Sequence, residues 1–387
     1  MRRTKKKNKG HFIKKLFFII ILILNIGVAI PLLLSYFAQY TPPARSELIT
    51  LCGLAFPYLL FANLLFSIVW LFLKYQYTLI SLCLILINIH NIDRHYQLKA
   101  MEKPLKCINC VKVMSYNVKL FDLYNSNKEE FGKGKEQIFN YLKKEKPDIA
   151  CFQEYFYEKG SKLDFNTTDS ILAILDLKND EKFYYQYFPS HSKNEYYYGI
   201  AIFSKYRIID AGPVTMENNI NNNAIFADIR YKGDTIRIYN IHLASLHMEQ
   251  SDYETGKRFS QNIEDPEFNK NAKNILKKLN SAFLKRELQV KALYAHMDSC
   301  PHPIILCGDF NDTPASYSYN KLSKKLKDTF RESGKGKGYT YNGDAFPEYR
   351  IDFILYDKRY KAFGHTISKD ITISDHYPIY SYISLQE

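Results

Sequence analysis

Cysteine is sparse in this 387-residue chain, and its seven residues suggest neither a disulfide framework nor a zinc site. Cys107 and Cys110 form one Cys-x-x-Cys pair, "CINC", but no second Cys pair or His pair completes a set of four ligands. Four other cysteines lie in apolar segments: Cys52, Cys83, Cys151 and Cys307. The pair at 107 and 110 is therefore interpreted as a linker feature or a short disulfide.

Acidic residues are nearly absent from the first hundred positions. This region holds 2 of the 40 Asp and Glu but 12 of the 53 Lys and Arg, and eight of those basic residues lie within 1–15. Residues 101–387 therefore contain 38 acidic and 41 basic residues. The near-neutral body gives no electrostatic argument for a polyanionic partner. The net charge of +13 is better explained as a membrane-topology signal beside an apolar run.

Long apolar runs occur only in the N-terminal quarter. The segments at 16–37 and 49–73 are long enough to cross a bilayer as helices, whereas a third run at 77–92 is short for a span. No small-residue cleavage site follows the first run, which argues against a signal peptide. The sequence predicts four parts: a basic cytoplasmic tail (1–15), a transmembrane anchor (16–92), a linker (93–110) and a catalytic domain (111–387).

The number of spans decides on which side of the membrane the catalytic domain lies. The basic tail should remain in the cytoplasm. Three spans would then place the domain outside the cytoplasm, and two spans would place it inside. We favour a multi-pass protein with three spans and an extracytoplasmic domain, because a 16-residue apolar stretch after a tight turn has few soluble alternatives.

Strand and helix patterns alternate beyond residue 104. Predicted strands are 111–118, 148–154, 197–205, 224–231, 235–243, 303–310, 350–356 and 378–385. "KGD" at 232–234 predicts a hairpin turn, and apolar spacing across 269–297 predicts a helix. Strands this apolar, interleaved with helices, indicate sheets covered by helices.

Several apolar runs stop at a residue that can bind a metal or move a proton. These residues are Asn117, Glu154, His242, Asp309 with Asn311, and Asp375 with His376; Asp352 is polar within an apolar strand. Each alone has an ordinary explanation as a turn cap, a solvated strand end or a packed side chain. Together they predict one site, because neighbouring strand ends of a sheet converge in space.

These motifs, in this order, resemble the endonuclease/exonuclease/phosphatase superfamily, which includes pancreatic-type deoxyribonuclease, apurinic endonucleases, neutral sphingomyelinases and inositol polyphosphate 5-phosphatases. The resemblance covers about 110–385 and rests chiefly on "GDFND" and "SDHYP", with "YNVKLFD", "PDIACFQE", "YGIAIFSK" and "RIDFILYD" as weaker blocks. It implies an α/β four-layer α/β/β/α sandwich of two mostly antiparallel sheets. The transmembrane anchor lies outside the resemblance.

A metal-assisted phosphodiester hydrolysis would use these residues in distinct roles. Glu154 is a hard oxygen ligand suited to Mg²⁺ or Mn²⁺, and Asn117 and Asp375 would complete the coordination directly or through water. Asp309 is expected to orient or deprotonate the attacking water, and Asn311 to donate to a phosphoryl oxygen.

Two histidines are candidates for proton transfer. The resemblance nominates Asp352 as the carboxylate that orients His376. In deoxyribonuclease-like members, the histidine matching His242 has an acidic partner, and Glu195 is near here but not clearly in register. Apurinic endonucleases generally lack this histidine, so its presence favours the deoxyribonuclease, sphingomyelinase and phosphatase branches.

The expected function is a membrane-anchored, metal-dependent, endonuclease-like phosphodiester hydrolase. Its substrate would be nucleic acid or a phospholipid head group, and a sphingomyelinase-like enzyme acting at the lipid bilayer is the alternative. An inactive binding protein of the same fold would be expected to lack a key residue, yet Glu154, Asp309, Asp375 and His376 are all present. The stretch 244–300 stays open: a solvated helix or a wall of the substrate groove.

Overall fold

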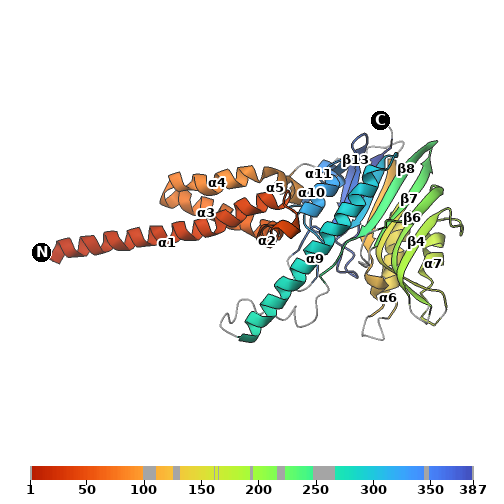
Figure 1. Ribbon diagram of the computed structural model, residues 1–387, viewed down its shortest axis with the longest axis horizontal. Helices are drawn as coiled ribbons and strands as arrows, with labels where there is room; N and C mark the ends of the chain where they lie inside the picture. The colour runs from red at the N-terminus through yellow and green to blue at the C-terminus, as the bar shows by residue number, and fades with distance from the viewer. Residues whose placement is uncertain are drawn as a thin grey trace. The chain divides into compact units, whose positions relative to one another are not determined.

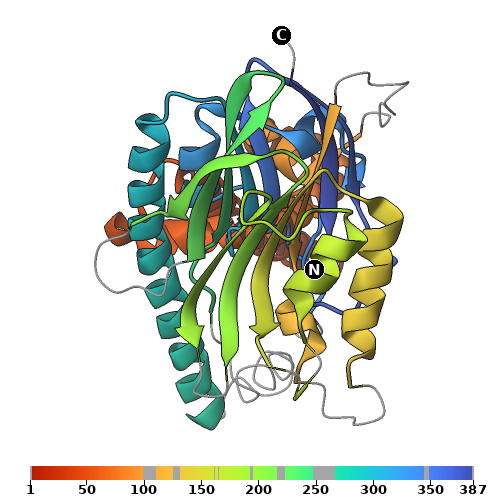
Figure 2. The same ribbon diagram turned by 90° about the vertical axis from the view of Figure 1, so that its right-hand side faces the viewer.

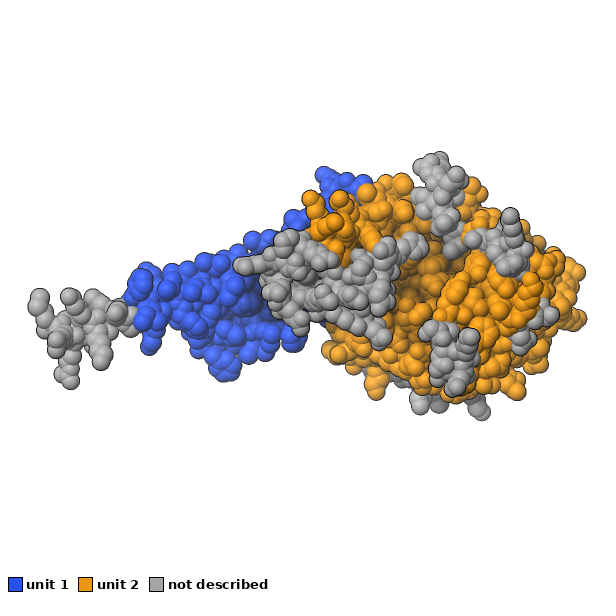
Figure 3. All heavy atoms as spheres, turned by 90° about the horizontal axis from the view of Figure 1, so that it is seen from below, with its two compact units in different colours: residues 1–92, 315–317 blue, residues 93–314, 318–387 orange. Residues whose placement is uncertain are grey.

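The computed structural model describes residues 2–98, 110–124, 131–160, 162–163, 165–191, 195–215, 223–246, 266–343 and 348–385. The chain divides into two compact units, shown in different colours in Figure 3: residues 1–92 with 315–317, and residues 93–314 with 318–387. The boundary lies inside helix α5 (Ile89–His95), so the last turn of that helix belongs to the second unit.

The first unit is helical. It contains α1 (Arg2–Ala38), α2 (Glu47–Leu54), α3 (Phe56–Leu73), α4 (Thr78–Ile87) and the start of α5, with short 3-10 turns at Pro43–Arg45 and Tyr75–Tyr77. Two helical stretches, His11–Ala38 and Phe56–Leu73, are long and apolar enough to cross a membrane. A third span exists only if the pair Tyr75–Ile87 and Ile89–His95, bent by 60°, counts as one.

The second apolar run, 49–73, forms parts of two helices rather than one, and the part long enough to cross a membrane is Phe56–Leu73. The helix is interrupted at Ala55, between α2 and α3, and a proline occupies the first turn of α3. Proline has no backbone N–H and is tolerated at the start of a helix but not in its interior. Pro57 therefore ends one helix and begins the next.

Buried polar side chains join the helices of this unit. Asn25 of α1 donates to Ser81 Oγ of α4 at 2.8 Å and accepts a hydrogen bond from Trp70 Nε1 of α3 at 2.9 Å. Asn88, directly after α4, donates to the backbone oxygen of Leu32 in α1 at 3.3 Å. In an apolar environment such bonds hold helices together, because no water competes for them. The third apolar run is thus bonded to the first.

The second unit is built on two six-stranded sheets. One has the order β10 (Leu326–Asp328), β12 (Asp352–Asp357), β9 (Ile304–Asp309), β8 (Asp234–His242), β7 (Asn223–Tyr231) and β6 (Ile208–Pro213). The other has the order β13 (Lys361–Ile367), β14 (Ile379–Ser384), β2 (Cys110–Asn117), β3 (Ile149–Glu158), β5 (Tyr196–Ser204) and β4 (Tyr184–His191). Neighbours are antiparallel except the parallel pairs β2–β3 and β8–β9.

Helices cover the outer faces of both sheets. Figures 1 and 2 show α9 (Pro266–Asp298) on one side of the strands, and α6 (Lys133–Glu145) with α7 (Thr167–Ile174) on the other. Apolar side chains from both sheets pack between them, including Val113, Ile202, Ile238, Ile305 and Ile354. The predicted four-layer α/β/β/α sandwich is therefore confirmed. Short elements complete the unit: a 3-10 turn (Lys119–Asp122), α10 (Tyr317–Ser323) and α11 (Thr329–Ser333).

The first residues of the predicted linker pack onto the second unit. Arg94 donates from Nη1 to the backbone oxygen of Pro314 at 3.2 Å, and its own backbone oxygen accepts from Arg350 Nη1 at 2.8 Å. Asp93 pairs with Arg331 at 2.6 Å. The next residues form β1 (Tyr96–Gln97), which pairs with β11 (Gly336–Lys337). Further along, Cys110 is disulfide-bonded, and Cys107 lies outside the described residues.

Candidate active site

Hydrogen-bond register alone places three predicted residues side by side. His242 is opposite Asp309 in the parallel pair β8–β9, and Asp352 is opposite Asp309 in the antiparallel pair β12–β9. The residue before Asp309 must be glycine: Gly308 has φ +145°, and an added Cβ would lie 2.0 Å from the backbone oxygen of Ile241. Glycine thus lets β9 approach β8 where both strands end.

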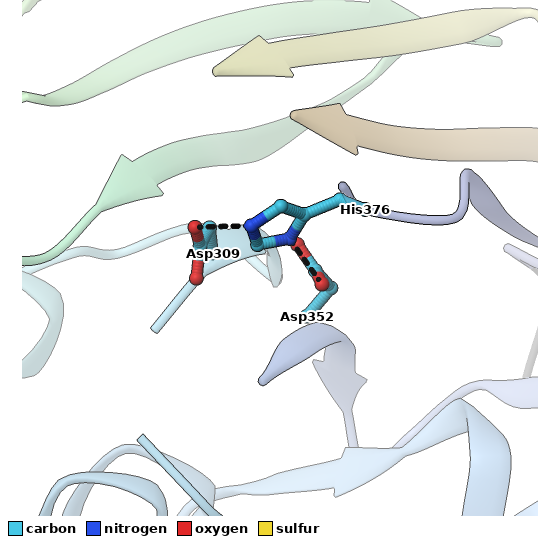
Figure 4. A group of neighbouring side chains, drawn as sticks. All are labelled: Asp309, Asp352 and His376. Atoms are coloured by element: carbon cyan, nitrogen blue, oxygen red, sulfur yellow. Dashed lines mark hydrogen bonds and ion pairs between the residues drawn. The ribbon is translucent and has the colours of Figure 1, made fainter. Parts of the chain in front are cut away.

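His376 connects Asp352 to Asp309 (Figure 4). Its Nδ1 lies 2.9 Å from Asp352 Oδ2, and its Nε2 lies 3.6 Å from Asp309 Oδ2. All three side chains are buried. Burial alone would lower the pKa of His376, but the carboxylates of Asp352 and Asp309 raise it to about 10. Burial raises the pKa of Asp309, although the neighbouring imidazoles oppose this.

Two further side chains approach the carboxylate of Asp309. His242 Nε2 lies 3.6 Å from Asp309 Oδ2 and 3.8 Å from Glu154 Oε1, and among the described residues this buried nitrogen has no hydrogen-bond partner. Asn311 donates from its backbone to Asp309 Oδ1 at 2.7 Å, and from Nδ2 to Asp309 Oδ2 at 3.2 Å and to the Leu243 oxygen at 3.0 Å. Both amide hydrogens of Asn311 are therefore already used.

Glu154 does not end a strand, as the sequence predicted, but lies in a bulge within β3. The β3–β5 register shifts between Phe152 and Tyr155, and Glu154 has φ +48°. A bulge redirects a side chain that regular pleating would place elsewhere, and strained backbone of this kind is concentrated at functional sites. Asn117 donates from Nδ2 to Glu154 Oε1 at 3.2 Å and to Asp309 Oδ2 at 3.1 Å. The amide thereby joins the two sheets at the site.

Asp375 also departs from the prediction, because it lies in a coil before β14 rather than after a strand. Ile371 and Ile373, which precede it, pack against the apolar cluster that includes residues of α6. The Asp375 carboxylate is about one-third exposed and lies 4.0 Å from Lys119 Nζ. Within the described part of the chain, no hydrogen bond or ion pair joins it to Glu154 or Asn117.

The carboxylates fall into a buried group and a partly exposed group. The buried group consists of Asp309, Asp352 and His376, which each have one carboxylate oxygen or imidazole nitrogen within 4.8 Å of those of the other two. Because Asp352 occupies Nδ1 of the imidazole, this buried group suits proton transfer. The Glu154 carboxylate is 35% exposed, and its described neighbours are Asn117 Nδ2 and His242 Nε2, so it offers the kind of accessible carboxylate oxygen that a hard divalent cation binds. The side-chain oxygen of Asn117 accepts a hydrogen bond from the Lys119 amide at 3.1 Å.

Glu195 is not the partner of His242. It lies before β5, where its backbone oxygen accepts a hydrogen bond from the Lys159 amide at 3.2 Å. Among the described residues, the carboxylates that form ion pairs with His242 are Glu154 and Asp309.

Two buried amides that were not predicted from the sequence, Asn240 and Gln153, connect the sheets behind the site. Asn240 donates to the backbone oxygens of Phe152 and Ala201, both at 2.9 Å, and accepts from Gln153 Nε2 at 2.6 Å. Each amide lies within two residues of a predicted site residue, in "YNIHL" and "CFQE". The sequence did contain a signal for them: each is an amide side chain inside an apolar strand, and a buried amide needs a hydrogen-bond partner.

Residues 114–376 match the endonuclease/exonuclease/phosphatase family, and residues 14–95 match a domain of unknown function. No curated protein matches the chain.

Among solved structures, an endonuclease/exonuclease/phosphatase family protein from Leptotrichia buccalis is 19% identical, with 70% of this chain and 98% of that chain covered and a TM-score of 0.46. The human Nocturnin catalytic domain with bound sulfate is 17% identical, with 71% and 94% covered and a TM-score of 0.47. A family protein from Beutenbergia cavernae is 16% identical, with 72% of each chain covered and a TM-score of 0.48. Because the family match spans more than half of its length, the chain belongs to the endonuclease/exonuclease/phosphatase family.

Proposed function

We propose that this chain is a membrane-anchored, divalent-metal-dependent phosphodiester hydrolase of the endonuclease-like kind. Members of its family are generally hydrolases of phosphoric esters. The supporting observation is the buried group in which Asp352 holds His376 at 2.9 Å and Asp309 lies 3.6 Å from the other imidazole nitrogen. Hydrolysis needs a base for water, a proton donor, and stabilisation of charge on the phosphoryl oxygens. The cluster contains groups suited to each task.

The individual roles follow from the contacts. Asp309, whose pKa is raised by burial, accepts the proton of the attacking water. His376, whose pKa of about 10 keeps it protonated near neutrality, presents its second nitrogen toward the site and supplies a proton. His242 Nε2, which has no hydrogen-bond partner among the described residues, can donate to a non-bridging oxygen. Asn311 would have to give up an existing hydrogen bond to do the same.

A bound Mg²⁺ or Mn²⁺ ion would supply Lewis-acid stabilisation of the phosphoryl oxygen. Glu154 would hold it, with Asp375 and Asn117 bound directly or through water. The bulge in β3 directs the Glu154 carboxylate toward the amide of Asn117 and the imidazole of His242. The inactive-protein alternative is less favoured because the residues expected to be lost are all present.

Activity and substrate class can be tested in one experiment. The full chain, reconstituted in nanodiscs, is assayed on plasmid DNA, RNA and sphingomyelin vesicles, with EDTA and then with excess Mg²⁺ or Mn²⁺. We expect turnover that EDTA abolishes and that the metal restores, with nucleic acid cleaved faster than sphingomyelin. Turnover unaffected by EDTA would contradict the mechanism. A large preference for vesicles would instead support the sphingomyelinase-like alternative, which the bilayer anchor also favours.

We also propose that the catalytic unit lies outside the cytoplasm, with three spans. The proposal is supported by the basic tail before the first span and by two hydrogen bonds between the third apolar run and α1, one from Asn25 to Ser81 and one from Asn88 to the Leu32 oxygen. We expect protease added to intact cells or spheroplasts to digest the C-terminal part, as detected by a C-terminal antibody. A C-terminus protected until the membrane is permeabilised would indicate two spans and a cytoplasmic enzyme.

A further inference from the structure

We propose that Arg286 and Gln289 of α9 are positioning residues, which fix the two chain segments that carry His242 and Asp309 to each other. The kinetic part of this proposal rests on the proposed hydrolytic function. Both side chains are 1% exposed, although α9 is an outer helix whose Lys270, Lys273 and Lys277 are exposed. Burying a guanidinium is unfavourable unless it is paired. The groups that the Arg286 guanidinium contacts therefore indicate which part of the structure its burial stabilises.

Arg286 and Gln289 together hold the backbone that follows β8. Arg286 Nη1 donates to the backbone oxygen of Ala244 at 2.9 Å, and the Ala244 amide donates to Gln289 Oε1 at 2.9 Å. Residues three apart on a helix lie on the same face. One face of α9 therefore binds both the backbone N–H and the backbone oxygen of Ala244. Ala244 is two positions after His242. Holding the Ala244 backbone therefore restricts the position of the end of β8, where His242 lies.

The same guanidinium lies against the loop that follows β9. Arg286 Nε is 3.7 Å from Asp312 Oδ2, which also accepts from Ser318 Oγ at 2.7 Å. Asp312 is 4% exposed and follows Asp309 by three positions. Burial lowers the pKa of Arg286, while the carboxylates of Asp312 and Asp309 act against this change. The buried cation therefore lies beside a buried loop carboxylate of opposite charge, which the Ser318 hydroxyl and the Thr313 amide also hold.

Backbone hydrogen bonds join the two held segments directly. The Leu243 amide donates to the backbone oxygen of Asp309 at 3.0 Å, and Asn311 Nδ2 donates to the backbone oxygen of Leu243 at 3.0 Å. Arg286 contacts the residue after Leu243 and the residue after Asn311. The arrangement sets the 3.6 Å separation between His242 Nε2 and Asp309 Oδ2. On this proposal α9 is both solvated and part of the site's support, because Lys270, Lys273 and Lys277 are exposed whereas Arg286 and Gln289 hold the two segments.

The test compares substitutions on one helix in the full chain, reconstituted in nanodiscs with Mg²⁺. Arg286→Ala and Gln289→Leu remove the contacts, whereas Gln289→Glu keeps an acceptor for the Ala244 amide. Val290→Ala, at a fully buried apolar neighbour, is the control for loss of packing alone. We expect kcat to fall about 10- to 100-fold for the first two variants, since small misplacements of reacting groups have effects of this size. KM should change little, and Gln289→Glu and Val290→Ala should retain most activity.

Two readouts separate positioning from general destabilisation. Guanidinium ion at millimolar concentration should raise kcat of Arg286→Ala saturably and leave Val290→Ala unchanged. Hydrogen exchange should accelerate at 242–246 and 309–313 in Arg286→Ala and Gln289→Leu, but not in Val290→Ala. Exchange does not depend on activity, so it decides the proposal even if the wild-type chain hydrolyses none of the substrates. If Arg286→Ala does not fold, the pair Gln289→Leu and Gln289→Glu decides.

Exchange at these segments no faster than in Val290→Ala would overturn the proposal. Equal kcat values for Gln289→Leu and Val290→Ala in an active enzyme would overturn it as well.

Discussion

Replacing His376 with alanine should lower kcat by about two to four orders of magnitude, the usual contribution of a positioned acid or base. The imidazole is the group that contacts Asp352 at 2.9 Å and approaches Asp309 to 3.6 Å, so its removal takes away the proposed proton donor. It also leaves two buried carboxylates near each other without the intervening charge. Asp309→Asn should lower kcat by a similar factor, because it removes the proposed base while preserving the shape of the side chain.

Steady-state kinetics on the preferred phosphodiester would measure both variants and the double variant. Groups that act as a unit are strongly non-additive, so the double variant should be little slower than either single one. His302→Ala is the matched control, since this histidine is partly exposed and its ion-pair partner at 3.9 Å is Asp228, outside the cluster. A kcat for His376→Ala within tenfold of the wild-type value would remove His376 from the chemical step.

Glu154→Gln should raise the Mg²⁺ concentration needed for half-maximal rate by at least about 10- to 100-fold. Substituting a residue that only hydrogen-bonds to a metal ligand already lowers metal affinity by this factor, and Glu154 is proposed to be a ligand itself. The substitution keeps the size of the side chain and one oxygen but removes the charge that a hard cation prefers. Because the carboxylate is 35% exposed and lies in a bulge rather than a core, the effect on stability should be small.

Metal dependence would be measured by titrating Mg²⁺ into the assay and, independently of activity, by following Mn²⁺ binding with electron paramagnetic resonance. Glu136→Gln provides a control, since this glutamate lies on α6 with a largely exposed side chain. An unchanged Mn²⁺ affinity in Glu154→Gln would show that the ligand assignment is wrong.

Apolar patterning identified the central strands of both sheets but not their edges. The strands at 111–118, 224–231, 235–243 and 303–310 correspond closely to β2, β7, β8 and β9, most of whose residues are buried. The strands not predicted include β4, β6 and β13, and all three are edge strands. An edge strand has one neighbour and more solvent, so its composition carries less of the apolar signal. β6, for example, is mostly exposed or half-buried.

The candidate residues could be named from the sequence because apolar runs stop at most of them, but their geometry could not be predicted. Glu154 depends on a shift in the pairing of β3 with β5, which arises between strands rather than within one. Asp375 was predicted to lie where an apolar run stops at a strand end, but it lies in a coil before β14, and the preceding Ile371 and Ile373 pack against the cluster that includes residues of α6. The contacts of Arg286 join segments more than forty positions apart, so no local pattern reveals them.

Asp93 and Arg94 belong to the second unit, and this determines where that unit could be fused to a different anchor. Arg94 donates to Pro314, five positions after Asp309, and Asp93 pairs with Arg331. A gene fusion that joined a new anchor at residue 101 would delete these contacts together with β1. A fusion made just before Asp93 would keep them. The portable module of this protein thus starts inside helix α5, at the first residue of the predicted linker (93–110).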